Sequence, residues 1–252
     1  MANSILMKNI KIKFNYVTLY LLLIALLCGF IKYALYVTFI ILFHEIGHAF
    51  IAIILGYNIK SIEIFPFGGM SKLDKPLNTP IIHDLLIAIM GIAFQLILSL
   101  LGHLLHIDYM FLKINQTIML FNLLPIIPLD GSKILFEIIC LFLSFRKSIN
   151  FYYISSFLFL IIYLIFSYKY ILSNYLVIAL FIYKTIEVIK NRKIICQKFI
   201  LERCLYNNLI FKRVKSNNEK IENFQKDVKY YYLIDSKLIS DKEYLINYYF
   251  DY

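Results

Sequence analysis

Two histidines and a glutamate lie close together in the chain, in the order His44-Glu45-Ile46-Gly47-His48. On an α-helix, residues four positions apart share one face and lie about 6 Å apart along the axis, so both imidazoles can reach one metal ion. Glu45 lies about 100° around the helix from His44, where its carboxylate can hold a water beside that metal without being a good ligand itself. The spacing therefore indicates a metal centre that activates water.

The surroundings of this motif strengthen the interpretation. Residues 37–42 and 49–55 are almost wholly apolar, and an ionisable side chain at the middle of a membrane costs roughly 2.5 to 3.5 kcal/mol. A divalent cation is the partner that satisfies the glutamate and both histidines. A catalytic zinc ion usually has three protein ligands and one open position, so a third ligand is expected elsewhere in the chain.

Asp130 is the strongest candidate for the third ligand. It follows Asn122-Leu-Leu-Pro-Ile-Ile-Pro-Leu, where Pro125 and Pro128 interrupt an apolar helix and free its backbone groups. An aspartate at that depth is costly unless it binds a cation. The alternative is a kinked helix whose aspartate lies at the water interface.

Other polar residues are weaker candidates for metal binding. Asp84 and Asp108 are at predicted span ends, and Glu137 can be solvated or paired with Lys133 four residues away. The spacing of His103, His106 and Asp108 would also suit a second metal site, although it is more typical of polar residues at a membrane interface.

The composition is typical of an integral membrane protein. The chain has 252 residues, of which 61% are hydrophobic and 17% charged, and this excludes an ordinary soluble domain. The net charge of +10 is spread over loops and tail, which indicates membrane orientation and contact with anionic lipid, not a nucleic-acid partner. The four cysteines form no CxxC pair and predict reduced thiols: Cys28, Cys140, Cys196 and Cys204.

Hydrophobic periodicity predicts an all-α polytopic membrane protein with about six transmembrane helices, a re-entrant β-hairpin loop and a small cytosolic α+β tail. The expected helices are 16–31, 34–55, 81–105, 109–127, 151–168 and 171–186. An apolar segment, 133–145, continues the fourth helix after the prolines. Six spans place both termini on one side, and the distribution of lysine and arginine makes that side cytosolic.

The segment from Ile59 to Leu73 is too short to span a membrane. Its alternating apolar residues and Gly68-Gly69 predict a β-hairpin at the membrane boundary, and an interfacial loop is the alternative. An edge strand over 62–67, with Phe65, Phe67 and Gly68, could hold an extended substrate peptide by strand pairing.

The composition becomes polar near Lys190, which divides the chain into a transmembrane domain with the expected metal centre, 1–189, and a tail, 190–252. In the tail we expect a linker at 217–220, a strand at 230–234 and a helix at 241–249. A module of this size has little core of its own, so it is expected to lean on the membrane domain or on another copy of the chain.

The HEIGH sequence at 44–48, together with NLLPIIPLDG at 122–131, resembles the site-2 protease family of intramembrane zinc metalloproteases. The PFGG loop at 66–69 and the FILER segment at 199–203 are similar to the sporulation branch of that family, which processes pro-sigma-K. The resemblance implies that His44, His48 and Asp130 bind one zinc ion and that Glu45 is the general base. It also implies that Asn122 and Pro128 help to hold substrate.

Two residues depart from the family pattern, because Ser132 replaces a second glycine after Asp130-Gly131 and Ile92 replaces a proline after Gly91. Neither is a metal ligand, so the departures bear on loop geometry more than on chemistry.

The resemblance further implies a membrane-associated pro-sigma factor as substrate, membrane-protein inhibitors as partners, and the mother-cell membrane around the forespore as location. The tail resembles a shortened CBS module, which makes ATP a candidate ligand. Other readings are a protease acting on an anti-sigma factor or signal-peptide remnant, and a metal transporter, although no inverted repeat of broken helices is seen. An inactive scaffold is disfavoured because every expected catalytic residue is present.

Overall fold

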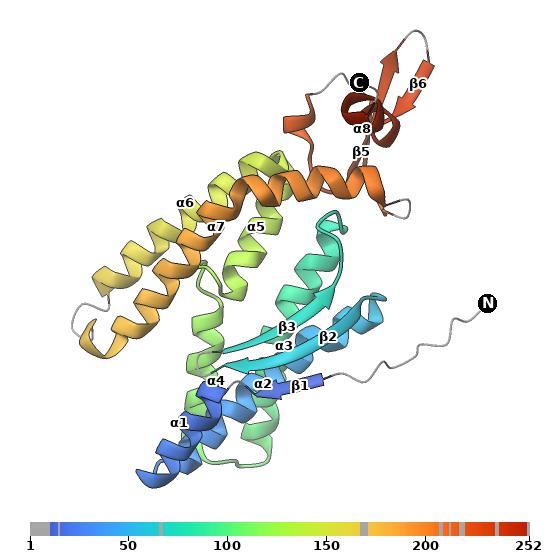
Figure 1. Cartoon of the computed structure of the whole chain (residues 1–252). Coiled ribbons are helices and arrows are strands. Elements are labelled where there is room, and N and C mark those ends of the chain that lie inside the picture. Colours follow the sequence, from blue (N-terminus) through green and yellow to red (C-terminus); the bar gives the residue numbers. More distant parts are fainter. Residues whose placement is uncertain are drawn as a thin grey trace. The chain divides into compact units, whose positions relative to one another are not determined.

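The structure is a computed structural model that describes residues 11–14, 16–65, 68–166, 171–206, 209–211, 213–216, 220–234 and 237–250 (Figure 1). The chain divides into two compact units. The first consists of Met1–Lys75 and Leu86–Leu123, and the second of Pro76–Leu85 and Leu124–Tyr252. The fold is mostly helical, with two small sheets.

The first unit combines a three-stranded sheet with apolar helices. Its elements are β1 (Lys11–Phe14), α1 (Tyr16–Leu27), α2 (Ile31–Ile54), β2 (Asn58–Phe65), β3 (Gly68–Asp74), most of α3 (Ile81–Leu104) and α4 (Tyr109–Asn122). Gly29 (φ 77°) follows α1 and Gly56 (φ 83°) follows α2. Both have a left-handed backbone conformation, which glycine adopts readily and which ends a helix.

The predicted hairpin is present as β2 and β3, which pair antiparallel from Asn58 with Asp74 to Phe65 with Gly68. β1 pairs parallel with β2, from Lys11 with Ser61 to Phe14 with Ile64. The sheet order is therefore β1-β2-β3 (Figure 1), and the expected edge strand over 62–67 is wrong, because β2 is the middle strand.

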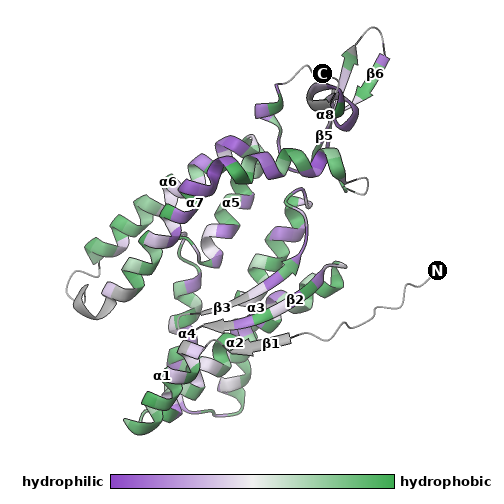
Figure 2. Ribbon diagram, viewed as in Figure 1, coloured by the Kyte–Doolittle hydropathy of each residue, from purple (hydrophilic) through white to green (hydrophobic). Residues whose placement is uncertain are grey.

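Among the described residues, three helices are long and apolar enough to cross a bilayer: α2, α3 and α6 (Phe145–Phe166). Figure 2 shows α1, α2 and α3 coloured mostly as hydrophobic. The predicted break at the prolines is confirmed, because α4 ends at Asn122 and α5 (Asp130–Phe142) begins seven residues beyond Leu123. Helices of 14 and 13 residues reach only about 20 Å each, less than the roughly 30 Å of a bilayer core. The count of six spans stays a prediction.

The second unit contains α5 and α6, and it ends in a small sheet and a last helix. Its other elements are α7 (Ile171–Leu205), β4 (Arg213–Ser216), a 3₁₀ helix (Ile221–Asn223), β5 (Val228–Ile234), β6 (Lys237–Ser240) and α8 (Asp241–Phe250). The sheet order is β4-β5-β6. The strand and helix expected in the tail are confirmed as β5 and α8, whereas α7 continues through the polar residues beyond 186. Residues 217–219 of the expected linker lie outside the described residues.

The tail has no separate core. One apolar cluster joins buried residues of α5, α6 and α7 to buried residues of the tail. Phe145 of α6 stacks on Phe199 of α7, with ring centres 3.9 Å apart, and Phe224 stacks on Tyr230 at 4.7 Å. The tail therefore packs against these helices, as its small size predicted. A domain boundary at residue 190 stays a prediction.

Candidate metal centre

The HExxH motif lies in the second half of α2, and its three chemical side chains are buried. His44, Glu45 and His48 are 5%, 4% and 5% exposed. The two imidazoles lie on the same face of the helix, with their rings nearly perpendicular and their Nε2 atoms 3.0 Å apart. The sequence-based prediction that His44 and His48 share one face of a helix is confirmed.

The outer nitrogens of both histidines are held by α3. His48 Nδ1 lies 2.6 Å from the backbone oxygen of Ile87, and His44 Nδ1 lies 3.1 Å from Oε1 of Gln95. Both partners are oxygens that only accept, so each Nδ1 carries the hydrogen and donates. A neutral imidazole then has a lone pair on Nε2. Two lone pairs therefore face each other, an arrangement that a cation stabilises.

The spacing of these two nitrogens fits a shared zinc ion. Zn–N bonds of about 2.0 to 2.1 Å at tetrahedral angles put two nitrogen ligands about 3.3 Å apart. Histidine ligands also usually donate their other N–H to a carbonyl or carboxylate oxygen, which fixes the tautomer. The histidine pair meets both requirements.

Gly91 of α3 lies directly against the histidine pair. A Cβ atom at this position would come within 2.4 Å of His48 Cε1 and 2.7 Å of His44 Cε1. A larger residue would displace the imidazoles, so the close approach of α3 requires glycine. The sequence flagged Gly91 only as part of a family pattern.

β3 positions Glu45. Ser71 Oγ donates to Glu45 Oε2 over 2.6 Å, and a Cβ atom on Gly69 would lie 2.2 Å from Glu45 Cγ. The strand backbone therefore passes directly over the glutamate. Sequence reasoning assigned Gly68-Gly69 to a turn and missed both Ser71 and Gln95, because nothing in the local sequence links residues 26 and 51 positions away to the motif.

Asp130 lies in the second unit, at the first position of α5, and is 3% exposed. Its Oδ1 accepts from Lys133 Nζ over 2.8 Å, and the positive end of the helix dipole also favours a carboxylate at this position. Asn122, the last residue of α4, is partly buried and Pro128 is exposed. Phe65 ends β2 and Gly68 begins β3, whereas Phe67 lies outside the described residues.

The alternative ligands have other partners. Asp84 and Glu137 both pair with Lys226. Asp108 caps α4 and pairs with Lys32, whose ammonium is the first cause that lowers the pKa of Asp108 to about 2. Within the described part of the chain, His103, His106 and Asp108 form no cluster of metal ligands, and both histidines are exposed.

Known proteins are similar to this chain in sequence and in fold. Residues 32–108 match peptidase family M50. The fold is similar to that of the Site-2 Protease from Methanocaldococcus jannaschii, with a TM-score of 0.53 and 22% identity over 81% of this chain and 96% of that one.

Two curated proteins are also similar in sequence. Stage IV sporulation protein FB of Bacillus subtilis is 33% identical over 133 residues, which are 50% of this chain and 46% of that protein. A zinc metalloprotease of Methanocaldococcus jannaschii is 34% identical over 131 residues, 44% of this chain and 37% of that protein. The chain thus spans less than half the length of either curated relative.

Proposed function

We propose that the protein is an intramembrane zinc endopeptidase. The observation that carries the proposal is the histidine pair, whose outer N–H groups donate to α3 and whose Nε2 lone pairs converge at 3.0 Å. The match of residues 32–108 to peptidase family M50 supports the same activity. Three membrane-length helices fit an enzyme that works within the bilayer.

Asp130 is proposed as the third ligand. With His44 and His48 it offers two imidazole nitrogens and one carboxylate oxygen, and all three residues are buried. This is one of the ligand sets used by catalytic zinc. The ion pair with Lys133 engages one carboxylate oxygen, Oδ1, and a ligating carboxylate is usually held in this way by a neighbour.

Glu45 is proposed as the general base. When bound, zinc would polarise the scissile carbonyl and lower the pKa of a water towards about 7. Glu45 would take a proton from that water and pass it to the leaving amine as the peptide C–N bond breaks, giving two peptides. The hydrogen bond from Ser71 holds the Glu45 carboxylate in one orientation for both transfers.

The substrate is proposed to be a membrane-associated pro-sigma factor, with pro-sigma-K as the first candidate because of the similarity to Stage IV sporulation protein FB. An anti-sigma factor or a signal-peptide remnant is the alternative. The substrate must be extended, because a helix hides its carbonyls in backbone hydrogen bonds. β1 and β3 are the edge strands of the described sheet, and β3 is proposed as the strand that a substrate joins because its backbone crosses Glu45 at Gly69. Asn122, Pro128 and the hairpin residues Phe65, Phe67 and Gly68 are proposed to contact the substrate.

The cellular setting is proposed from the similarity to Stage IV sporulation protein FB. The enzyme would lie in the mother-cell membrane around the forespore, with six spans and both termini cytosolic, and membrane-protein inhibitors would control access to Glu45. The hairpin would enter the membrane boundary. Strand backbone is tolerated at that depth only when protein or a water-filled cavity covers its polar groups.

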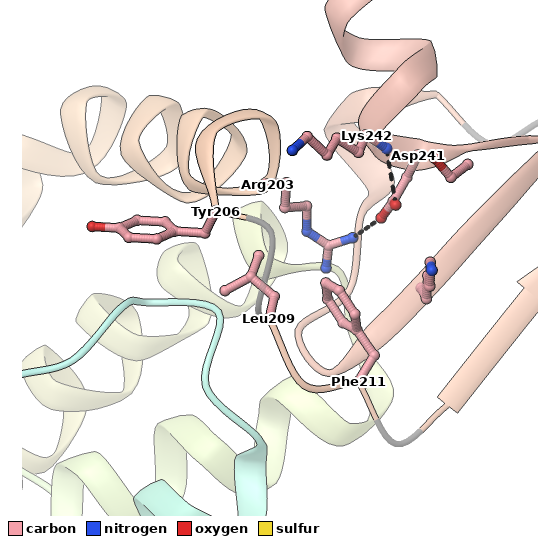
Figure 3. A pocket seen from close by; sticks show the side chains of 8 residues that line it. Arg203, Tyr206, Leu209, Phe211, Asp241 and Lys242 are labelled. Atoms are coloured by element: carbon pink, nitrogen blue, oxygen red, sulfur yellow. Dashed lines mark hydrogen bonds and ion pairs between the residues drawn. The ribbon is translucent and has the colours of Figure 1, made fainter. Parts of the chain in front are cut away.

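The tail offers a pocket for a ligand, and ATP is the proposed ligand. The cavity has a volume of about 330 Å³ and is lined by Tyr206, Phe211, Lys229 and Lys242, among others. Figure 3 shows Arg203 and the backbone of Lys242 directed at Asp241, so Arg203 is already engaged. The two aromatic rings could stack on a base, and the two lysines could pair with phosphate.

The test is co-expression of the chain with pro-sigma-K from the same host, comparing wild type with Glu45→Gln, Asp130→Ala and the exposed control Glu222→Gln. We expect cleavage by wild type and control only, with substrate size followed on a gel. Purified Glu45→Gln should still bind zinc, whereas Asp130→Ala should bind it more weakly. Zinc flux retained in Glu45→Gln would instead indicate a transporter, and an intact substrate with wild type would exclude pro-sigma-K.

A further inference from the structure

A buried lysine of the tail joins two helices of the second unit. The side chain of Lys226, which precedes β5, is 3% exposed. Its Nζ donates to Asp84 Oδ2 in the first turn of α3 and, over 2.6 Å, to Glu137 Oε1 in the middle of α5. One cation thus serves two carboxylates from helices that are far apart in sequence.

Both carboxylates contact this lysine directly. Asp84 also accepts a hydrogen bond from Thr79 Oγ1. Glu137 Oε2 has no hydrogen-bond partner among the described residues, so Lys226 provides the charged contact that Glu137 makes. Without the ammonium, two like charges would remain buried together, a state that a protein avoids by moving the groups apart or by protonation.

The backbone on either side of Lys226 is clamped by two arginines. Arg203, 2% exposed, donates to the carbonyl oxygens of Gln225 and Val228 over 2.7 and 2.9 Å. Arg213 donates to the carbonyl oxygen of Lys226 itself over 3.0 Å. The direction of the lysine side chain is therefore set by the fold of the tail.

The two helices that Lys226 joins are those that serve the metal centre. Glu137 lies seven residues after Asp130 on α5, which is two turns, about 10 Å, along the same face. Beyond its first turn, α3 continues to Ile87, Gly91 and Gln95, the residues that hold the histidines. A shift of α5 against the start of α3 would displace Asp130.

We propose that Lys226 is a positioning residue for the metal centre, whose ammonium fixes α5, and with it Asp130, against the first turn of α3. The inference rests on the proposed role of Asp130 as a zinc ligand. On this proposal the tail helps to position a zinc ligand, whether or not the tail itself binds a nucleotide.

The experiment measures zinc affinity and peptide cleavage with the full chain in detergent. For Lys226→Met we expect a zinc Kd raised about 10- to 100-fold, as for other residues that hold metal ligands, with kcat at saturating zinc within about threefold of wild type. The neutral triple variant Lys226→Met, Asp84→Asn, Glu137→Gln removes all three charges of this cluster together, so its zinc Kd should return to within about threefold of wild type.

Two controls separate positioning from general loss of stability. Leu245→Ala weakens the same tail core and changes none of the hydrogen bonds of Lys226 or of the two arginines, so it should lower the thermal midpoint while leaving the zinc Kd unchanged. Lys237→Met removes an exposed tail lysine and should change neither quantity. An unchanged zinc Kd in Lys226→Met, or an equal rise in Leu245→Ala, would overturn the proposal. If Asp130→Ala itself binds zinc like wild type, the third ligand is wrong, a result separate from either outcome for Lys226.

Discussion

At the scale of single residues, the two histidines are suited to the proposed role of metal ligands because of the groups that hold their outer nitrogens. The carbonyl of Ile87 and the amide of Gln95 fix both tautomers so that both Nε2 atoms present lone pairs. Two histidines four residues apart would otherwise share a proton between these nitrogens. The histidine pair therefore needs both helices: α2 carries the two side chains, and α3 carries the groups that fix their tautomers.

Gly91→Ala tests this close packing. The added methyl would come within 2.4 Å of His48 Cε1, so we expect the imidazoles to move and the zinc affinity to fall at least about 10-fold. Zinc titration of the purified chain measures the change.

Gly102→Ala is the matched control for this substitution, because its added methyl on the same helix meets the end of the flexible Leu112 side chain. It should leave zinc affinity unchanged even if it costs some stability. Equal zinc affinities in all three proteins would mean that the contact of α3 does not set the ligand geometry.

At the scale of elements, β3 carries two tasks. Its backbone crosses Glu45 at Gly69, and it is one of the two edge strands of the described sheet, β1 being the other. A substrate strand added to β3 would lie beside Glu45, the proposed general base. For that reason we expect a substrate to add to β3 and not to β1.

A photoreactive residue distinguishes the two sides of the sheet. Placed at position 72, where the side chain is exposed on β3, it should crosslink to substrate in a Glu45→Gln background, in which substrate is bound and not cleaved. The same residue at position 12, on β1, should give little or no crosslink. The reverse pattern would show that substrate enters on the β1 side or displaces that strand.

Local patterns were enough to predict the elements with strong periodicity. The ends of α2 and α3 lie within about three residues of the expected ones, and the hairpin follows from its alternation and its glycines. β1 was missed because a strand of four residues pairs with residues 50 positions away, and such pairing leaves no local signal. For the same reason His44, Glu45 and His48 could be identified from the sequence, whereas Ser71 and Gln95 could not.

At the scale of the whole molecule, the tail was expected to be too small for its own core, and its buried residues do share one cluster with α5, α6 and α7. What the sequence could not show is that its charges are also shared. Lys226 and Arg203 are buried cations whose partners come from the start of α3, from α5 and from the tail itself.

The pocket in the tail makes a nucleotide response testable. We expect full-length protein to bind ATP, and Lys229→Ala or Lys242→Ala to weaken binding about 10-fold, because each removes a charged contact to phosphate. Calorimetric titration measures the affinity, with the exposed Lys237→Ala as control. Absence of binding heat in wild type, or equal affinity in all variants, would exclude this pocket as an ATP site.

The bridge made by Lys226 also orders events during synthesis. Asp84 and Glu137 are made 142 and 89 residues before the lysine that neutralises them. Ribosomes add about 5 to 20 residues per second, so α5 would wait roughly 5 to 20 s in the membrane without its cation. On the proposed role of Lys226, a nascent chain would therefore hold zinc weakly until most of the tail had left the ribosome, and an unfinished copy of the proposed protease would not cleave neighbouring membrane proteins.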